Sequence, residues 1–358
     1  MILRAPEYYK DFHCLADKCK ESCCSAGWEI DIDEKTFYLY NNVSSKFGEK
    51  LRDNIDFSKE PHFILDKNGN CPFLNKNKLC EIYINLGPNS LCHICKEHPR
   101  YYEWFNGIKE CGIGLCCEEA AKIILSQNKP FSTYEIEIPF EDVDDYNDEL
   151  YTYLYTARKI IISHLEISSI PFNYRVRNII WYGYNLQQQI YNNTIFSEQD
   201  MVEIEQVNIL SDEGLKPILE FLLNLESCNK SWIPYLKNCI DLFDNYTNKI
   251  SEFEFSHPEI NTYLQNISIY FIWRYFLKAT FDEDVLSKIG LFAISIAILK
   301  YLFFCEWLKN GKISFDTCIN ITKRFSEEIE YSEENIISIY DACYELSAFS
   351  INNLINLY

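Results

Sequence analysis

Apolar residues recur every three to four positions over most of the last two thirds of the chain. The spacing is clear at Leu150 and Leu154, and it returns between Ile336 and Leu346. A period of this length places apolar side chains on one face of a helix. The pattern predicts an irregular bundle of about eight helices over residues 150–358, and hence a mainly α fold.

Helix-start signals accompany this pattern. Ser314 and Ser332 have the positions of N-caps, and the same signal occurs at Ser197 and Asp212. The longest apolar run, Ile289 to Leu299, is shorter than the roughly 20 residues of a membrane span. We therefore predict a buried helix there and no association with a membrane.

The pattern changes between residues 126 and 149. Residues 134–138 alternate like one exposed strand, and carboxylates are dense between Glu141 and Glu149. We expect a cysteine-rich module with little regular structure over residues 1–125, an acidic linker over 126–149, and an all-helical domain over 150–358.

Cysteines are concentrated at the start of the chain. Of the 16 cysteines, 11 lie at or before Cys117. Disulfides persist only in oxidising compartments, and residues 1–10 lack the apolar core of an export signal. We therefore expect a cytoplasmic protein whose clustered thiols bind a metal.

The remaining five cysteines stand singly in apolar helical stretches, where a free cysteine usually behaves as a small hydrophobe. We expect them to be packing residues. They are Cys228, Cys239, Cys305, Cys318 and Cys343.

The formal net charge is −20, from 53 acidic and 33 basic residues. Nucleic acids are bound through clustered Lys and Arg, so a nucleic-acid partner is not expected. The charge suits a basic protein partner, or it only keeps the protein soluble.

The first cysteine group reads Cys14-x4-Cys19-x3-Cys23-Cys24. Successive side chains of an extended segment point in opposite directions. The adjacent pair is therefore expected to serve two centres, or one centre and the core, and one of the two thiols need not be a ligand.

Further thiols follow at Cys71, Cys80, Cys92 and Cys95, and then at Cys111, Cys116 and Cys117. Cys117 directly precedes a predicted helix over Glu118–Leu125. The positive end of the helix dipole would lower the pKa of its thiol and favour the thiolate that metals require. Spacing alone leaves zinc and an iron–sulfur cluster equally open.

Several motifs together carry a family resemblance. They are Phe12-x-Cys14-x4-Cys19-x3-Cys23-Cys24, Gly27-Trp28-x-Ile30-x-Ile32-Asp33, Cys71-Pro72-Phe73-Leu74, Leu79-Cys80-x-Ile82, Leu86-Gly87, Cys95-x3-Pro99-Arg100 and Cys117-x-Glu119-Ala120-Ala121. This first third of the chain resembles the flagellin lysine-N-methylase (FliB) family and, more distantly, the YkgJ-like cysteine-cluster proteins.

The resemblance implies a protein-lysine N-methyltransferase that moves methyl groups from S-adenosylmethionine to surface lysines of flagellin. It also implies a [4Fe-4S] cluster, with zinc as the alternative. Cys92 and Cys116 occupy positions where the family is expected to have serine, and His98 replaces its usual aromatic residue before Pro99. The ligands that the resemblance implies are Cys14, Cys19, Cys23, Cys24, Cys71, Cys80, Cys95 and Cys117.

No residue identifies itself from the sequence as the base that methylation of an ammonium group needs, and no S-adenosylmethionine site is apparent. Gly112-x-Gly114 follows no suitable strand, so a dinucleotide-type fold is not expected. The alternative function is non-catalytic. In it, the cysteine module chelates zinc or iron, and the acidic helical domain binds a basic protein partner.

Overall fold

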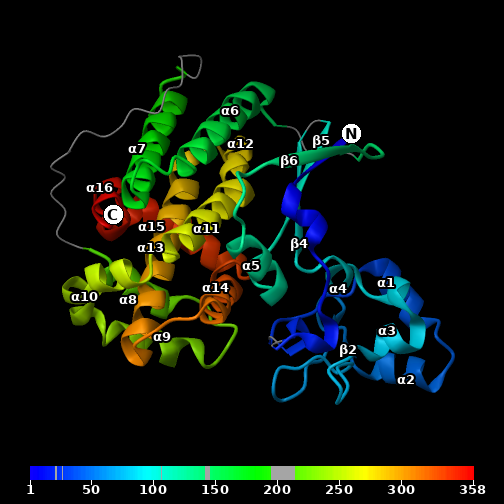
Figure 1. Cartoon of the computed structure of the whole chain (residues 1–358). Coiled ribbons are helices and arrows are strands. Elements are labelled where there is room, and N and C mark those ends of the chain that lie inside the picture. Colours follow the sequence, from blue (N-terminus) through cyan, green and yellow to red (C-terminus); the bar gives the residue numbers. More distant parts are fainter. Residues whose placement is uncertain (21, 26, 106, 142–145, 195–213) are drawn as a thin grey trace.

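The computed structural model describes residues 1–20, 22–25, 27–105, 107–141, 146–194 and 214–358. Within these ranges it contains sixteen α-helices and six β-strands (Figure 1). The expected mainly α fold is confirmed, and the cysteine-rich part consists of short elements. Its elements are β1 (Ile2–Pro6), α1 (Glu34–Asn41), α2 (Lys46–Asp53), β2 (Ile55–Asp56), β3 (His62–Phe63), α3 (Glu81–Leu86), α4 (His93–Glu97), β4 (Arg100–Phe105), β5 (Ile108–Ile113), α5 (Glu118–Leu125) and β6 (Thr133–Glu137).

The remainder is a bundle of helices packed around α13. More helices are described than the eight or so expected, because the shortest span too few residues to show a helical period. The helices are α6 (Asp148–Leu165), α7 (Phe172–Tyr191), α8 (Lys216–Phe221), α9 (Trp232–Ile240), α10 (Phe243–Ser256), α11 (Ile260–Tyr275), α12 (Ala279–Asp282), α13 (Val285–Asn310), α14 (Phe315–Ile329), α15 (Glu333–Glu345) and α16 (Ile351–Asn356).

The helix α13 contains the long apolar run. By length and composition it could cross a membrane, but 94% of its apolar window is buried inside the protein. The helices α7, α11 and α15 pack against it. The prediction of a buried helix is confirmed.

Two predicted N-caps are confirmed. The Ser314 hydroxyl accepts a hydrogen bond from the backbone N–H of Thr317 at 3.1 Å, and Ser332 accepts one from Asn335 at 3.2 Å. The other two expected caps, Ser197 and Asp212, lie outside the described residues.

A four-stranded sheet, in the order β4-β5-β1-β6, connects the two parts of the chain. The strand β1 runs parallel to β5 and antiparallel to β6. The alternating segment near residues 134–138 is therefore a strand, as expected, and it forms an edge of this sheet. Much of the acidic run beyond it, residues 142–145, lies outside the described residues.

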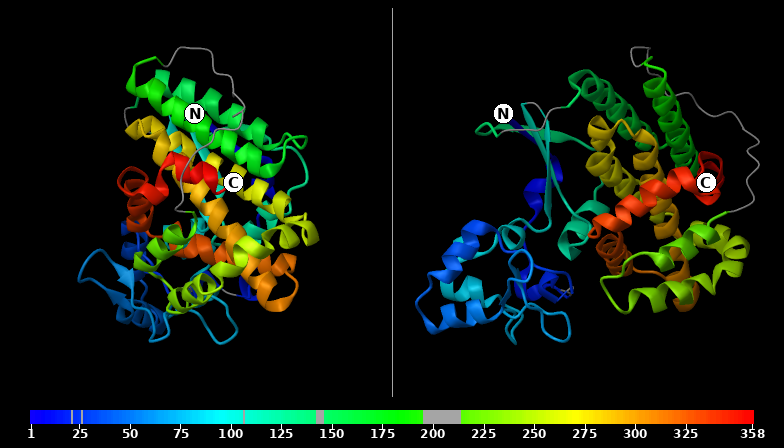
Figure 2. Two further views of the ribbon diagram at one scale, coloured as in Figure 1. Left: turned by 90° about the vertical axis from the view of Figure 1, so that its left-hand side faces the viewer. Right: turned by 180° about the vertical axis from the view of Figure 1, so that it is seen from behind.

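The buried apolar side chains form two clusters. We call one the N-terminal cluster; it contains only residues between Ile30 and Cys92. The helical cluster is far larger, and it also takes in Tyr8, Phe12 and the apolar face of α5. In the right-hand view of Figure 2, the helices α1, α2 and α3 (blue to cyan) lie to one side of the helical bundle. The domain boundaries at residues 125 and 149 stay a prediction.

A buried ion-pair network fastens the sheet to the helices. Glu110 on β5 accepts hydrogen bonds from both terminal nitrogens of Arg158 on α6, at 2.6 and 2.7 Å. Arg4 on β1 donates to the same carboxylate at 3.2 Å. All three side chains are buried. Arg4 also donates through Nε to Glu135 on β6 at 2.7 Å, so the buried charge of Arg158 is the one that relies on Glu110 for its compensation.

Candidate metal centre

All sixteen cysteines fall within the described ranges, and all are free thiols. Four of the predicted ligands gather at the start of α5. Cys117 is the N-cap of that helix, and the Cys19 thiol donates to the Glu118 carboxylate at 3.6 Å. The same carboxylate oxygen accepts the backbone N–H of Lys20 at 2.9 Å, which fixes the cysteine segment against α5.

The Cys23 thiol belongs to the same neighbourhood. A hydrogen bond with Cys24 and burial both raise its pKa, and repulsion from nearby Cys14 and Cys117 raises it further. These three thiols come from positions up to 103 residues apart (117 − 14 = 103). The fold therefore brings the first cysteine group to Cys117.

The other predicted ligands border the N-terminal cluster. Cys71 is part of that cluster, and Cys24 and Cys80 pack against it. The backbone N–H of Cys71 donates to the Cys24 carbonyl at 2.7 Å. Cys95 lies beside this group: its pKa is raised by a hydrogen bond with Cys92, by burial, and by the charges of neighbouring thiols that include Cys24 and Cys71.

Cys92, which stands outside the ligand set that the resemblance implies, lies close to this group. It is fully buried in the N-terminal cluster, and its sulfur is 3.4 Å from that of Cys95. Its charge also acts on Cys71 and Cys80. Cys116 is different, because its thiol donates to the Tyr331 hydroxyl at 2.8 Å.

The donor set fits the implied metal in chemistry. Thiolates are the ligands of structural zinc and of iron–sulfur clusters alike. Within the described residues, however, no three His, Cys, Asp or Glu side chains converge on a point where a single ion would bind. A tetrahedral Zn–S₄ site would hold its sulfurs about 3.8 Å apart, whereas a cubane spreads them more widely. The ligand assignment stays a prediction.

The helix start lowers the pKa of the Cys117 thiol as expected, but the net shift is upward, so the expected low pKa was wrong. Burial raises the pKa of this thiol, although the backbone N–H groups of Ala120 and Glu119 act to lower it. The free-energy cost of burying a thiolate is larger than its stabilisation by the N–H groups at the helix start, because the site is shielded from water. A bound metal ion would reverse the balance by binding the thiolate directly.

The C-terminal cysteines are largely packing residues, as expected. Cys318 and Cys343 are buried in the helical cluster. Cys239 and Cys305 are buried there too, but they are not isolated, since their side chains are hydrogen-bonded to each other. The two cysteines are 66 residues apart, so no local sequence pattern predicts this contact.

An aromatic contact joins the cysteine-rich part to the helices. The ring of Trp28 stacks on Tyr331, with centroids 4.8 Å apart, and lies 5.4 Å from the ring of His98. Nδ1 of His98 is 3.3 Å from the Tyr331 hydroxyl. Burial, aided by the charge of Lys323, lowers the pKa of His98 to about 4. No sequence motif pointed to Tyr331.

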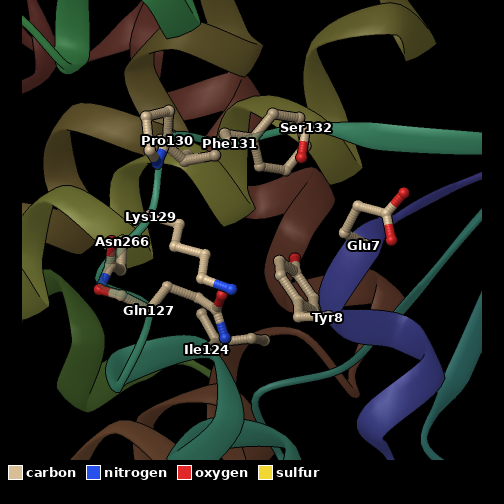
Figure 3. Close-up of a pocket in the computed structure, with 10 residues that line it drawn as sticks. Glu7, Tyr8, Ile124, Gln127, Lys129, Pro130, Phe131, Ser132 and Asn266 are labelled. Carbon is tan, nitrogen blue, oxygen red and sulfur yellow. The ribbon is translucent and has the colours of Figure 1, made fainter.

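A small pocket lies between the N-terminal segment, α5 and α11. Glu7 and Tyr8 line one side of it, and Lys129 and Phe131 belong to the loop after α5 (Figure 3). Its volume is about 70 Å³. Pockets for ligands of cofactor size measure about 300–1,000 Å³, so S-adenosylmethionine does not fit this pocket in the present conformation.

The helical part matches a family model described as the FliB lysine N-methylase C-terminal domain, over residues 158–357. The chain belongs to the FliB family. This FliB chain is 22% identical over 385 residues to the lysine-N-methylase of Salmonella typhimurium, and the match covers 92% of each protein. It is 27% identical over 146 residues to the flagellar biosynthetic protein FliU of Salmonella muenchen, covering 37% of this chain and 86% of that protein. No solved structure matches it significantly. As a member of the FliB family, the chain is an enzyme of the methyltransferase class.

Proposed function

We propose that this enzyme methylates lysine side chains of flagellin with S-adenosylmethionine, in the cytoplasm, and depends on a [4Fe-4S] cluster held by its N-terminal cysteines. The observation that carries the proposal is the extent of similarity. The match to a protein named lysine-N-methylase covers 92% of the chain, so it includes cysteine-bearing residues as well as the helical domain. The name of the FliU relative supports a flagellar substrate.

The proposed reaction requires a neutral lysine amine. Bound S-adenosylmethionine would supply an electrophilic methyl group, and the amine nitrogen must offer it a free electron pair. A lysine ammonium has a pKa of about 10.4 in water, so its proton must be removed or its pKa depressed in a dry site.

His98 is a poor candidate for the proton acceptor. Its pKa is lowered to about 4. Taking a proton from an ammonium of pKa about 10.4 would therefore cost roughly 9 kcal/mol. We therefore propose a structural role for Trp28, His98 and Tyr331, and we propose none of them as the general base.

Methylation of purified flagellin, assayed without oxygen and with labelled S-adenosylmethionine, tests the proposal. Intact protein should incorporate label into lysine. Cys23→Ser should abolish methylation and reduce the broad absorbance of the iron–sulfur centre, whereas Cys116→Ser should matter much less. Circular dichroism on each variant separates a lost cluster from a lost fold.

Two results would count against the proposal. Full methylation by a folded variant that has lost its metal would leave the cluster a structural role at most. No methylation by intact, metal-loaded protein would favour the alternative of a metal-binding module whose acidic surface binds a basic partner. Flagellin with its surface lysines replaced by arginine serves as the substrate control.

A further inference from the structure

The pocket beside α5 combines two polar side chains with apolar walls. In Figure 3 the Lys129 side chain extends across the pocket toward Tyr8. Neither the Lys129 ammonium nor the Tyr8 hydroxyl makes a hydrogen bond or an ion pair with any residue that the structure describes. The walls between them include Ile124, Phe131 and Ile269. Both polar groups are therefore available to a ligand.

The charge of the pocket favours an anion. Among its lining residues only Glu7 has a carboxylate, and this carboxylate already pairs with Lys10 at 2.9 Å. The charge of Lys129 has no ion-pair partner within the described part of the chain. Burial raises the pKa of Tyr8 well above its ordinary value, so the hydroxyl keeps its proton and can donate it to a ligand. Two donors, of which one is charged, suit a carboxylate and disfavour an ammonium group.

The loop after α5, which bears the charged donor, is held in place on both sides of it. The Asn266 side chain on α11 donates to the carbonyls of Leu125 and Gln127 at 3.0 and 2.9 Å. The backbone N–H of Phe131 donates to the Glu166 carboxylate at 2.5 Å. A loop that is ordered before binding lowers the entropy cost of holding a ligand.

The volume of about 70 Å³ sets the size of the ligand. A water-sized group occupies about 10–15 Å³ in this measure, so roughly five to seven non-hydrogen atoms fit. A carboxylate on a short carbon chain has this size. Glu7, Lys129 and Ser132 are exposed, so the pocket opens to the surface and a longer ligand can extend outward.

We propose that this pocket binds a carboxylate, held by the Lys129 ammonium and the Tyr8 hydroxyl, with its carbon chain against Ile124 and Phe131. Two ligands share this chemistry. One is a free short-chain carboxylate, and the other is the amino-acid end of S-adenosylmethionine, whose remaining atoms would lie outside the pocket. The second source rests on the proposed function, whereas the binding of a carboxylate does not.

Calorimetric titration of the full chain, without oxygen and without flagellin, tests the proposal. Butyrate should bind more tightly than n-butylammonium. Lys129→Gln removes the charge and Tyr8→Phe removes only the hydroxyl. Each should weaken butyrate binding about tenfold or more, because each removes a hydrogen bond to a charged group. Lys129→Arg should retain most of the affinity.

The matched control is Lys122→Gln, which changes the net charge equally but outside the pocket. Lys122 lies on α5, its side chain is 58% exposed, and it pairs with Glu119 at 3.7 Å. This variant should bind butyrate as the unaltered protein does. Circular dichroism checks that each variant folds, and if Tyr8→Phe does not, the exposed Lys129→Gln still decides.

S-adenosylmethionine and its decarboxylated analogue separate the two sources. If the carboxylate of S-adenosylmethionine occupies the pocket, the unaltered protein should bind this cofactor about tenfold or more tightly than the analogue, and Lys129→Gln should bind both alike. If Lys129→Gln loses butyrate but binds S-adenosylmethionine as before, the ligand is a free carboxylate.

Two results would overturn the proposal. One is that neither butyrate nor the carboxylate of S-adenosylmethionine contributes to any binding that depends on Lys129. The other is tighter binding of n-butylammonium than of butyrate, which would make the pocket a site for an amine. Methylation of flagellin is assayed separately, so the enzyme can methylate without this site, and a carboxylate can bind to a chain that does not methylate.

Discussion

His98 illustrates what burial does to a single titrating side chain. It lies against Trp28 and Tyr331, and burial together with the charge of Lys323 lowers its pKa to about 4. Above about pH 6.5 the imidazole is neutral in both the folded and the unfolded chain. Between pH 6.5 and 4 only the unfolded chain takes up the proton, so this residue costs stability as the pH falls through that window.

Replacing His98 with Phe should remove this pH dependence while keeping an aromatic ring beside Trp28. Between pH 7 and pH 4, the unaltered protein should lose up to about 3 kcal/mol more free energy of unfolding than His98→Phe. Denaturant unfolding at a series of pH values, with equal metal content in both proteins, measures the difference. Parallel pH profiles would show that His98 is already protonated or is accessible to water.

At the scale of elements, Glu110 is the link between sheet and helices. Glu110→Ala would leave the buried guanidinium group of Arg158 without its carboxylate, whereas Arg4 would keep its ion pair with Glu135. Breaking a buried pair in this way typically costs about 3–5 kcal/mol. Thermal unfolding should show a marked drop in midpoint.

The matched control for this substitution is Glu141→Ala. Glu141 pairs with Lys109, the neighbour of Glu110, but its side chain is 44% exposed. An exposed pair contributes about 0–1 kcal/mol. Equal losses from the two substitutions would mean that water reaches the Glu110 network.

The helices α7 and α13 meet at a glycine. A Cβ on Gly183 would lie 2.5 Å from Cγ1 of Ile289, closer than real contacts allow. Gly183→Ala should therefore destabilise the fold by about 1–2 kcal/mol, because overpacking outweighs the gain in helix propensity.

A double-mutant cycle with Ile289→Ala checks the cause. Each single substitution and the double substitution are compared for their loss of free energy of unfolding. The double variant should lose at least about 1 kcal/mol less than the sum of the two single losses, because Ile289→Ala removes the atoms with which the new side chain at position 183 would clash. If the two losses are additive, the destabilisation by Gly183→Ala does not come from its contact with Ile289.

Local sequence patterns were sufficient to predict several of the long helices. The apolar period predicted the helical character of α6 and α15, and the long apolar run predicted α13. Hydroxyl residues marked the starts of α14 and α15. Contacts between segments that are distant in the sequence have no such local pattern. Neither the stacking of Trp28 on Tyr331 nor the pairing of β1 with β5 could be predicted, because no local period records which segments meet.

For the cysteines, the sequence predicted a metal site, and this stays a prediction. Clustering of thiols indicated a metal, and adjacency of Cys23 and Cys24 already left two centres open. The sorting of the remaining thiols between α5 and the N-terminal cluster depends on the tertiary fold. For Cys117 the sequence predicted the lowering of the pKa by the helix start but not the larger rise from burial, because burial cannot be judged from a position before a helix.

At the scale of the whole molecule, the charge of −20 should speed encounters with lysine-rich surfaces. The screening length falls from about 30 Å at 0.01 M salt to about 8 Å at 0.15 M. We expect kcat/KM for flagellin to fall about tenfold or more over this range while kcat stays nearly constant.

Methylation rates at low and at saturating flagellin, measured across a sodium chloride series, check this expectation. A short lysine peptide with acidic flanking residues is the control, and its kcat/KM should rise or stay level with salt. A flat response for flagellin would show that the acidic balance has no part in its recognition.

The placement of β1 has a consequence for how the protein is made. Ile2 lies opposite Ile108 on one side and Glu137 on the other, so β1 leaves the ribosome more than a hundred residues before either of its partner strands. At about 5–20 residues per second, that delay is roughly ten seconds. Through this interval a strand with two bare edges and a series of reduced thiols stay exposed on the nascent chain, and bare strand edges are prone to aggregate. Slower growth at lower temperature, in cells that supply chaperones and exclude oxygen, should therefore raise the soluble yield.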